Sequence, residues 1–207
     1  MLTITDNIAT IQRDINMGIA NYINARLASR RTALISGVSR LIPKWINDQP
    51  EIASLQSSDD ISLAGQFGLT SSASIVSSIV DSIVSSVNIT VVPFDRSLSG
   101  GLELSFQPSD FANLLNLSIG HVRYQGGNLH WLDWLLTKGD TIIVANYHYN
   151  PGTGLGRSGL GNMTPGGAFR VPPQYSGTTD NNFITRALSG TSQEQEITKV
   201  FNDILGS

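Results

Sequence analysis

Cysteine is absent from the 207-residue sequence, and other features that mark whole classes of protein are absent or scarce with it. Without cysteine the chain has no disulfide, no thiolate nucleophile and no cysteine-ligated zinc or iron–sulfur site. No apolar run approaches the ~18 residues of a membrane span, so we expect no membrane association. The first residues, MLTITDNIATIQRD, have neither the basic start nor the apolar core of a secretory signal.

Charge is also scarce. Only 14% of the residues are charged, whereas the share in an average soluble domain is about 25%. One explanation is that much of the surface contacts other protein chains, because interface cores are depleted in charge. The alternative is a solvated surface of Ser, Thr, Asn and Gln, which are abundant here. The net charge of −3 provides no basic field that would attract nucleic acid.

The clearest pattern in the sequence lies at its start. Apolar residues recur at spacings of three and four from Ile4 to Leu27, which predicts a long helix with one apolar stripe. The pattern continues from Leu34 to Trp45, and Pro43 predicts a break near its end. Basic residues also recur in this region, and two pairs of them are four residues apart, which places the members of each pair on the same face of the helix. They form either a solvated face or a docking stripe for an acidic partner: Arg26, Arg30, Arg31, Arg40 and Lys44.

A second helix is predicted against residue propensity. The stretch TSSASIVSSIVDSIVSSV is rich in β-branched residues, which favour strands. Its Ile–Val pairs nevertheless begin at Ile75, Ile79 and Ile83, four residues apart. A strand would place the two members of each pair on opposite faces, whereas a helix places all of them on one wide stripe. The spacing therefore predicts a helix.

Residues 47–69 predict a loop with short turns, and the sequence after the second helix alternates short strand and helix patterns. Strand-like runs are NITVVPF, GGLELSFQ and DTIIVANYHY, and SIGHVRY follows a predicted helical turn at 111–115. LHWLDWLLTKG predicts a short helix that ends at Gly139 in a left-handed conformation. Residues 191–205 predict a C-terminal helix. We therefore expect a single α+β domain over 1–207, in which a long N-terminal helix and further helices pack on a small, mostly antiparallel sheet.

A glycine-rich segment at 150–178 interrupts this order. Gly154, Gly156 and Gly159 match the G-x-G-x-x-G pattern of dinucleotide sites, but the glycines and proline that follow cannot begin the helix which such a site needs. No Gly-Lys-Ser/Thr occurs either. The segment instead predicts an extended arm: a flexible loop, the anchor FRVPP, and a return at Thr179 or Asp180, either of which could cap a short helix. We expect a deletion of 156–167 to leave the monomer folded and to stop assembly.

Residue types with catalytic chemistry are few. His121, His130 and His148 lack the spacing of a helical metal pair, and the string GRSGL lacks the second glycine of a nucleophile elbow. The histidines are interpreted as structural, and the alternative is a three-histidine site assembled in space. Trp131 and Leu135 have the spacing of core residues. The sequence therefore predicts no catalytic residue, no metal site and no cofactor.

Three stretches carry a resemblance to a known family: QPEIASL with GQFGL, then WLDWLLTKGD, then GRSGLGNM with FRVPPQYSGTTDNNFITRAL. Together they resemble virion proteins of contractile- or long-tailed bacteriophages, of the neck or tail-completion type that joins head and tail. The resemblance extends from the middle of the first helix to Leu188. It implies an α+β subunit that forms a ring, six- or twelve-fold, around the DNA channel. It implies neither enzyme activity nor a cofactor.

The same resemblance implies the partners. They are further copies of the chain and the adjacent connector and tail proteins, while genomic DNA passes through the channel without specific binding. The localisation implied is the virion, assembled in the host cytoplasm. Candidate subunit contacts lie in or near the arm: Gly156, Arg157, Ser158, Phe169, Arg170, Val171, Pro172, Pro173, Tyr175 and Arg186. The alternatives are a tail terminator or tail-tube component, a hydrolase that uses the histidines, and a monomeric module that binds one peptide partner.

Overall fold

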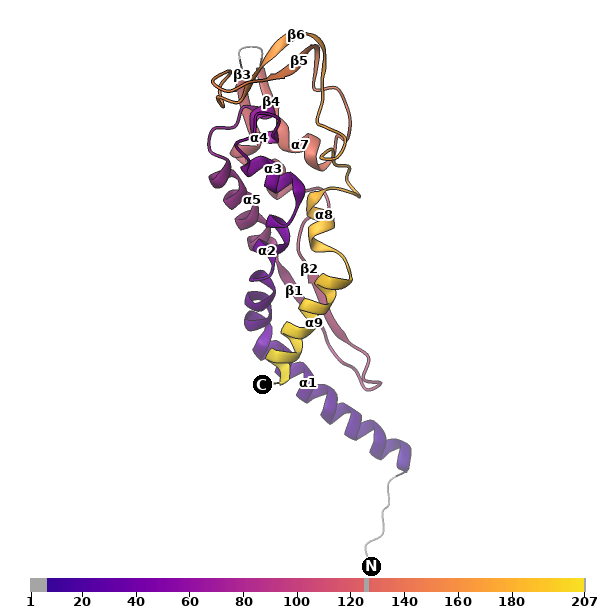
Figure 1. Ribbon diagram of the computed structural model, residues 1–207. Helices are drawn as coiled ribbons and strands as arrows, with labels where there is room; N and C mark the ends of the chain where they lie inside the picture. The colour runs from indigo at the N-terminus through magenta and orange to yellow at the C-terminus, as the bar shows by residue number, and fades with distance from the viewer. Residues whose placement is uncertain (1–6, 125–126, 207) are drawn as a thin grey trace, which may run out of the picture. The chain divides into compact units, whose positions relative to one another are not determined.

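The computed structural model describes residues 7–124 and 127–206, and Figure 1 shows the order of their elements. The predicted α+β fold is confirmed. The helices are α1 (Ile8–Ser39), α2 (Ile42–Asn47), α3 (Pro50–Gln56), α4 (Leu63–Phe67), α5 (Ser72–Ser86), α6 (Ala112–Leu115), a 3₁₀ turn (Ser118–Gly120), α7 (Trp131–Leu136), α8 (Phe183–Leu188) and α9 (Thr191–Gly206). The strands are β1 (Asn88–Val92), β2 (Gly101–Ser105), β3 (His121–Tyr124), β4 (Gly127–His130), β5 (Val144–Pro151) and β6 (Gly161–Phe169).

The predicted small antiparallel sheet is present as three two-stranded sheets. Each pairs consecutive strands, in the orders β1–β2, β3–β4 and β5–β6. The longest ribbon pairs Val144 with Phe169 at one end and Pro151 with Gly161 at the other. A register shift between Ala145 and Tyr147 coincides with Asn146, whose φ is 62°. Such a bulge bends the strand and increases its twist.

Contacts within the chain divide the described residues into two compact units. Unit 1 takes its residues from Met1–Arg40, Val87–Ser105 and Gln195–Ser207, and unit 2 from Leu41–Ser86 and Phe106–Glu194. The expectation of one domain over 1–207 stays a prediction. In the sequence, α1 ends at Ser39 and α2 begins at Ile42 with Pro43 in its first turn. Proline is tolerated there because the first helical N–H groups have no partner within the helix, and the predicted break is confirmed.

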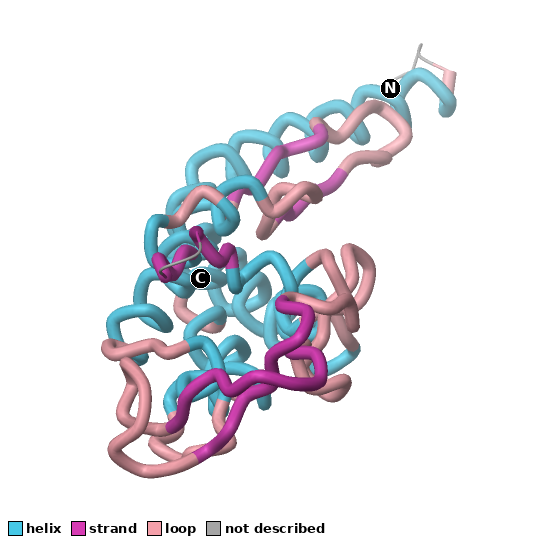
Figure 2. Tube along the Cα trace, turned by 90° about the horizontal axis from the view of Figure 1, so that it is seen from above, coloured by secondary structure: helices cyan, strands magenta, loops and turns pink. Residues whose placement is uncertain are grey.

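Unit 1 is built along α1. The Asn7 side chain accepts a hydrogen bond from the backbone N–H of Ala9 at 2.8 Å and so caps the helix start. The hairpin β1–β2 lies beside the helix, as Figure 2 shows. Asn24 holds it by two bonds, accepting from the backbone N–H of Phe94 at 2.7 Å and donating to its carbonyl at 3.0 Å. Arg31 donates to the carbonyl of Ile89 at 2.7 Å. The hairpin is therefore fastened to α1 by side chains of the helix itself.

The second partner of α1 within unit 1 is the C-terminal helix α9, present where the sequence predicts a helix over 191–205. At Gly37 a Cβ atom would lie 2.6 Å from Cγ1 of Val200, so the helices approach too closely for a larger residue. Arg26 donates from Nε and Nη2 to the carbonyl of Leu205, at 2.9 and 2.6 Å. This satisfies one of the carbonyls that a helix end leaves unpaired.

Unit 2 holds the larger core. The Ile–Val pairs of α5 point inward, which confirms the prediction made from spacing against propensity: Ile79 and Ile83 are fully buried, and Ile75, Val76 and Val80 nearly so. Trp131 and Leu135 of α7 are also fully buried, as predicted. Gly139 has the expected left-handed conformation, with φ 62°, but the prediction that it caps the helix is wrong, because α7 ends at Leu136 with Thr137 as its cap. Other fully buried side chains include Leu34 of unit 1 and, in unit 2, Ile42, Ile46, Ile52, Leu55, Leu63, Leu114 and Phe183.

Candidate functional site

The glycine-rich segment forms the loop between β5 and β6. Gly154, Gly156 and Gly159 all have positive φ, and the N–H of Gly154 bonds the carbonyl of Gly159 at 2.7 Å. A Cβ atom at Gly156 would lie 1.9 Å from the carbonyl oxygen of Gly161. Glycine is therefore required here by a tight turn and by close approach of two backbones. No helix begins inside the motif, so these glycines do not form a dinucleotide site.

Side chains of the same loop bind their own unit. Arg157 donates from Nε to the carbonyl of Gly68 at 3.1 Å and from Nη1 to that of Arg123 at 2.8 Å. Ser158 is half-buried and accepts from the N–H of Leu160 at 3.3 Å. The hydroxyl of Tyr149 on β5 donates to the carbonyl of Asp60 at 2.7 Å. The loop is thus ordered within its own chain, where we expected an arm that becomes ordered on a neighbour.

The anchor FRVPP alternates as predicted, but its apolar side chains point into unit 2. Phe169 is 5% exposed and meets the ring of Phe67 edge-on at 6.3 Å, and Val171 is fully buried. Arg170 is exposed and pairs with Asp140 at 3.3 Å. Phe169 and Val171 therefore serve the chain's own core. Of Phe169, Arg170 and Val171, Arg170 is the residue whose side chain another protein could contact.

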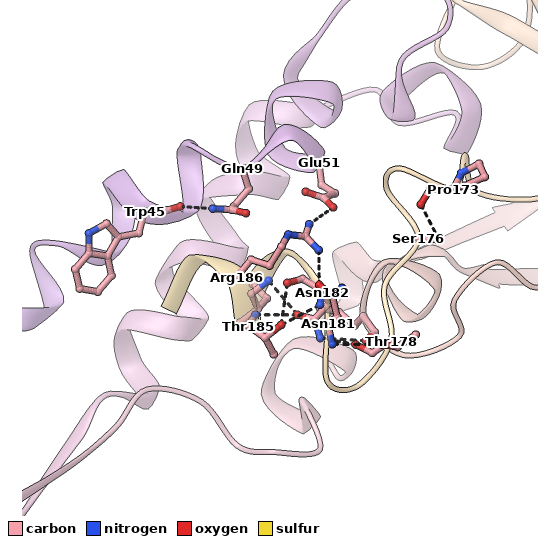
Figure 3. A network of polar contacts seen from close by, with 12 residues as sticks. Trp45, Gln49, Glu51, Pro173, Ser176, Thr178, Asn181, Asn182, Thr185 and Arg186 are labelled. Carbon is pink, nitrogen blue, oxygen red and sulfur yellow. Dashed lines mark hydrogen bonds and ion pairs between the residues drawn. The ribbon is translucent and has the colours of Figure 1, made fainter. Parts of the chain in front are cut away.

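The turn after the anchor closes on itself. The N–H of Tyr175 bonds the carbonyl of Pro172 at 2.9 Å. The hydroxyl of Ser176 bonds the carbonyl of Pro173 at 3.0 Å (Figure 3). Pro173 is exposed, whereas Pro172 and Tyr175 are half-buried. Pro173 thus joins Arg170 as a predicted contact residue that the fold leaves accessible.

Arg186, the last predicted contact residue, forms an ion pair inside unit 2. Its Nη2 bonds Oε1 of Glu51, whose side chain is 1% exposed, and its Nη1 bonds Oδ1 of Asn181 at 3.1 Å (Figure 3). The other oxygen of the Glu51 carboxylate has no hydrogen-bond partner among the described residues. A buried carboxylate with one satisfied oxygen depends strongly on its single cation. Arg186 is therefore interpreted as structural.

The helix that follows is capped by Asn182, so the prediction of Thr179 or Asp180 as the cap is wrong. The Asn182 side chain accepts from the N–H groups of Ile184 and Thr185, each at 3.0 Å. The hydroxyl oxygen of Thr185 accepts in return from the N–H of Asn182 at 2.9 Å, which completes a capping box. Asn182 also donates to the carbonyl of Leu136 at 3.2 Å. In the sequence, the signal for this cap is Asn182 followed three residues later by Thr185, which is the spacing of a capping box.

Beneath the β5–β6 ribbon lies a pocket of about 680 Å³. Its apolar lining includes Phe67, Val122, Leu129, Met163 and Phe169, and its polar lining includes Tyr149, Asn162 and Arg157. Burial raises the pKa of the Tyr149 phenol, with a smaller contribution from Asp60. The volume and the apolar lining are those of a site for a small molecule or an apolar peptide side chain.

The three histidines do not converge. His121 and His130 face each other across β3–β4, with ring centroids 4.1 Å apart and planes at 6°. His130 Nε2 is buried without a hydrogen-bond partner among the described residues, and burial, followed by the charge of His121, lowers its pKa. His148 instead bonds Gly166 and Thr164 of β6. Residues 7–124 and 127–206 contain no group of three or more His, Cys, Asp or Glu that could hold a metal.

The main surface feature that sequence reasoning missed lies on α1. The predicted stripe is largely uncovered: Ile8 is 81% exposed, Ile15 56%, Ile19 42% and Tyr22 66%. The buried residues of the helix are Ala20, which was not predicted, and Leu27, Leu34 and Val38, which continue the predicted pattern towards its C-terminal end. Other exposed large apolar residues are scattered singly, whereas these four lie along one helix. A contiguous exposed apolar surface marks an interaction site more often than isolated residues do.

No family model, no curated protein and no solved structure matches the chain. Among the helices of the described residues, none combines the length and the apolar character that crossing a bilayer requires.

Proposed function

We propose that the chain is a structural virion protein of a tailed bacteriophage, of the neck or tail-completion type, which assembles as a ring around the DNA channel. The sequence resemblance supplies the class. The observation that carries assembly is the uncovered apolar surface of unit 1. Four large apolar side chains of α1 are 42% to 81% exposed, and no described residue of α9 is buried.

Burial of such a surface on another chain removes apolar area from water, and this is the main favourable term in association. Each side chain that becomes fully buried contributes on the order of 1.5–3 kcal/mol before the costs of ordering. Scarce charge supports the same reading, because repulsion between copies is weak when few residues are charged. A six- or twelve-fold ring, a place in the virion and adjacent connector and tail proteins as partners belong to this proposal. A tail terminator or tail-tube component remains the variant within the class.

The histidine arrangement supports a structural role over a hydrolase. A general base must reach the proton it removes and needs a third group to orient it. His148 is engaged with the backbone and a threonine of its own ribbon, and His121 and His130 are stacked on each other. We propose no catalytic residue, metal or cofactor, and expect DNA to pass without specific contacts, in keeping with a net charge of −3.

A second candidate, a monomeric module that binds one peptide partner, is favoured by the pocket in unit 2. Its volume of about 680 Å³ and its apolar lining suit an apolar peptide side chain. Arg157 at the rim has no carboxylate partner within salt-bridge distance among the described residues, so an acidic group could bind there. This candidate needs no self-association.

The two candidates are separated by the mass of the purified protein, measured by light scattering over a wide concentration range and followed by negative-stain imaging. Assembly predicts a mass that rises with concentration towards closed rings or tubes. A monomer mass at every concentration, together with binding of a peptide at the pocket, would favour the binding module. A matched variant, Met163→Asp, should abolish such peptide binding and leave assembly unchanged.

A further inference from the structure

Helix α1 carries two apolar stripes on different faces. The inner stripe, Ala20, Leu27, Leu34 and Val38, is buried. The outer stripe, Ile8, Ile15, Ile19 and Tyr22, is exposed. At 3.6 residues per turn their centres are about 110° apart around the helix. The outer stripe therefore faces a different direction from the buried one, and the half-buried Ile23 lies between them.

The spacing of the outer stripe is that of a coiled coil. Positions 8, 12, 15, 19 and 22 follow one another at intervals of four, three, four and three. This is the 3.5-residue repeat that keeps a stripe facing a partner helix. It spans about 21 Å, from the rise of 1.5 Å per residue. It ends at Arg26, the next position in the repeat, whose guanidinium is bound to the carbonyl of Leu205.

The surroundings of the stripe allow a second copy to approach. Flanking positions are uncharged and include Gly18, where a Cβ atom would have no neighbour within 4 Å. The charged residues of this part of α1, Arg13 and Asp14, pair with each other at 3.4 Å. They lie more than about 100° around the helix from the stripe. No like charges therefore meet when two such stripes come together.

The position of Gln12 favours one orientation of two copies over the other. It is the one polar residue of the stripe and is exposed. In a parallel, in-register pair Gln12 lies opposite Gln12 of the other copy, and each amide can donate to and accept from its equivalent. In an antiparallel pair centred on Ile15, Gln12 would face Ile19 and lose its partner. A single polar residue in such a seam is a known determinant of register.

We propose that Ile8, Gln12, Ile15, Ile19 and Tyr22 form a seam that packs against the same seam of a neighbouring copy, parallel and in register. The proposal names the contact by which the chains associate, and in that respect it rests on the proposed assembly function. Rotation about a ring axis keeps equivalent residues at one height along that axis. A seam that meets its own equivalent joins two chains, so a ring would consist of such pairs, with α1 along the ring axis and a second surface linking one pair to the next.

The experiment uses the full chain and three variants. Ile15→Asp places a charge in the seam and should weaken association by at least about thirtyfold, because charges are excluded from tightly packed interface centres. Gln12→Leu should strengthen association, which partial unfolding would not do. Ile61→Asp is the matched control, because Ile61 is 69% exposed outside α1. It should leave association unchanged. Circular dichroism checks that each variant is folded.

A single-cysteine variant tests the orientation, since the native chain has no cysteine. Tyr22→Cys should form a disulfide between copies under mild oxidation, and Ile61→Cys should not. In the antiparallel alternative the two introduced thiols would be about 21 Å apart and could not join. Loss of association in Ile15→Asp without a Tyr22→Cys crosslink would overturn the parallel seam. Unchanged association in Ile15→Asp would overturn the seam and leave ring assembly standing. A wild-type chain that never associates would contradict both.

Discussion

The two units differ in how much of their apolar surface they cover. Unit 2 buries Trp131 and Phe183 fully and most of the inward face of α5 almost fully. Unit 1 buries one stripe of α1 and leaves a second stripe and all of α9 partly or fully exposed. A unit that covers its own apolar core is stable without a partner, whereas a unit with exposed apolar surface gains free energy when another chain covers that surface. We therefore propose that unit 2 supplies most of the stability and that unit 1 carries the assembly surface.

The largest expected effect is a loss of stability in unit 2. Phe183 is fully buried, so Phe183→Ala should lower the free energy of unfolding by about 3–5 kcal/mol. Tyr22→Ala in unit 1 should change that of the dilute chain by less than about 0.5 kcal/mol. Urea unfolding followed by circular dichroism measures both. Equal losses at the two positions would remove the difference between the units.

The next effect concerns the ion pair of Glu51 and Arg186. Arg186→Ala leaves a carboxylate that is 1% exposed without its cation. We expect the free energy of unfolding to fall by about 2–3 kcal/mol. This is less than the ~3–5 kcal/mol expected for a fully buried pair, because the arginine side chain is 38% exposed. The double variant Glu51→Gln, Arg186→Ala should recover part of that loss in the same urea measurement. A double variant no more stable than the single one would show that the uncompensated charge is not the cause.

A smaller effect distinguishes two glycines of the β5–β6 loop. Gly154 and Gly156 have φ of 81° and 67°, but a Cβ atom would have open space at Gly154 and would collide with a carbonyl at Gly156. Gly154→Ala should cost about 1 kcal/mol and Gly156→Ala about 2–3 kcal/mol. The difference appears as a lower melting temperature for Gly156→Ala. Similar melting temperatures would mean that the loop does not fold back on its own unit.

The smallest effect is a dependence of stability on pH. Burial and the charge of His121 lower the pKa of His130 from its usual 6.5. The unfolded chain then binds more protons than the folded one just below that value. Stability should be fully present above pH 6.5 and fall as the pH drops through it towards the folded pKa. Urea unfolding at about pH 8 and about pH 5 should show a shallower pH dependence for His130→Gln than for the wild type. An unchanged slope would contradict the role of His130.

Local patterns predicted much of the fold. The spacing of the Ile–Val pairs in α5 predicted the structure better than their strand propensity did, because residues four apart lie on one face of a helix. Pro43 marked the break between two helices. The loop predicted at 47–69 contains α3 and α4, and α7 ends three residues before Gly139. The sequence did not predict that each pair of consecutive strands forms a ribbon of its own, because strand periodicity does not show whether neighbouring ribbons join into one sheet. Asn182 was missed as a cap because Thr179 and Asp180, which stand earlier in the same stretch, have side chains that can cap a helix in the same way.

The candidate site was predicted less well. Phe169 and Val171 have the alternation of a strand that could pair with a neighbour, and the same alternation serves a strand that packs on its own core. A deletion of 156–167 would remove most of β6, from Gly161 onward. We now expect it to unfold part of unit 2, and the earlier expectation of a folded monomer is revised. The α1 stripe was visible as a repeat, but periodicity does not show which of two faces the chain covers itself.

The central claim is that copies of the chain meet through unit 1. Amide hydrogen exchange, compared between dilute and concentrated protein, tests it most directly because it locates the protected segment in each unit. The account predicts that protection rises with concentration in α1 between Ile8 and Tyr22, while the β5–β6 loop of unit 2 exchanges at the same rate in both samples. Protection that rises in the loop and not in α1 would contradict it and place the contact in unit 2.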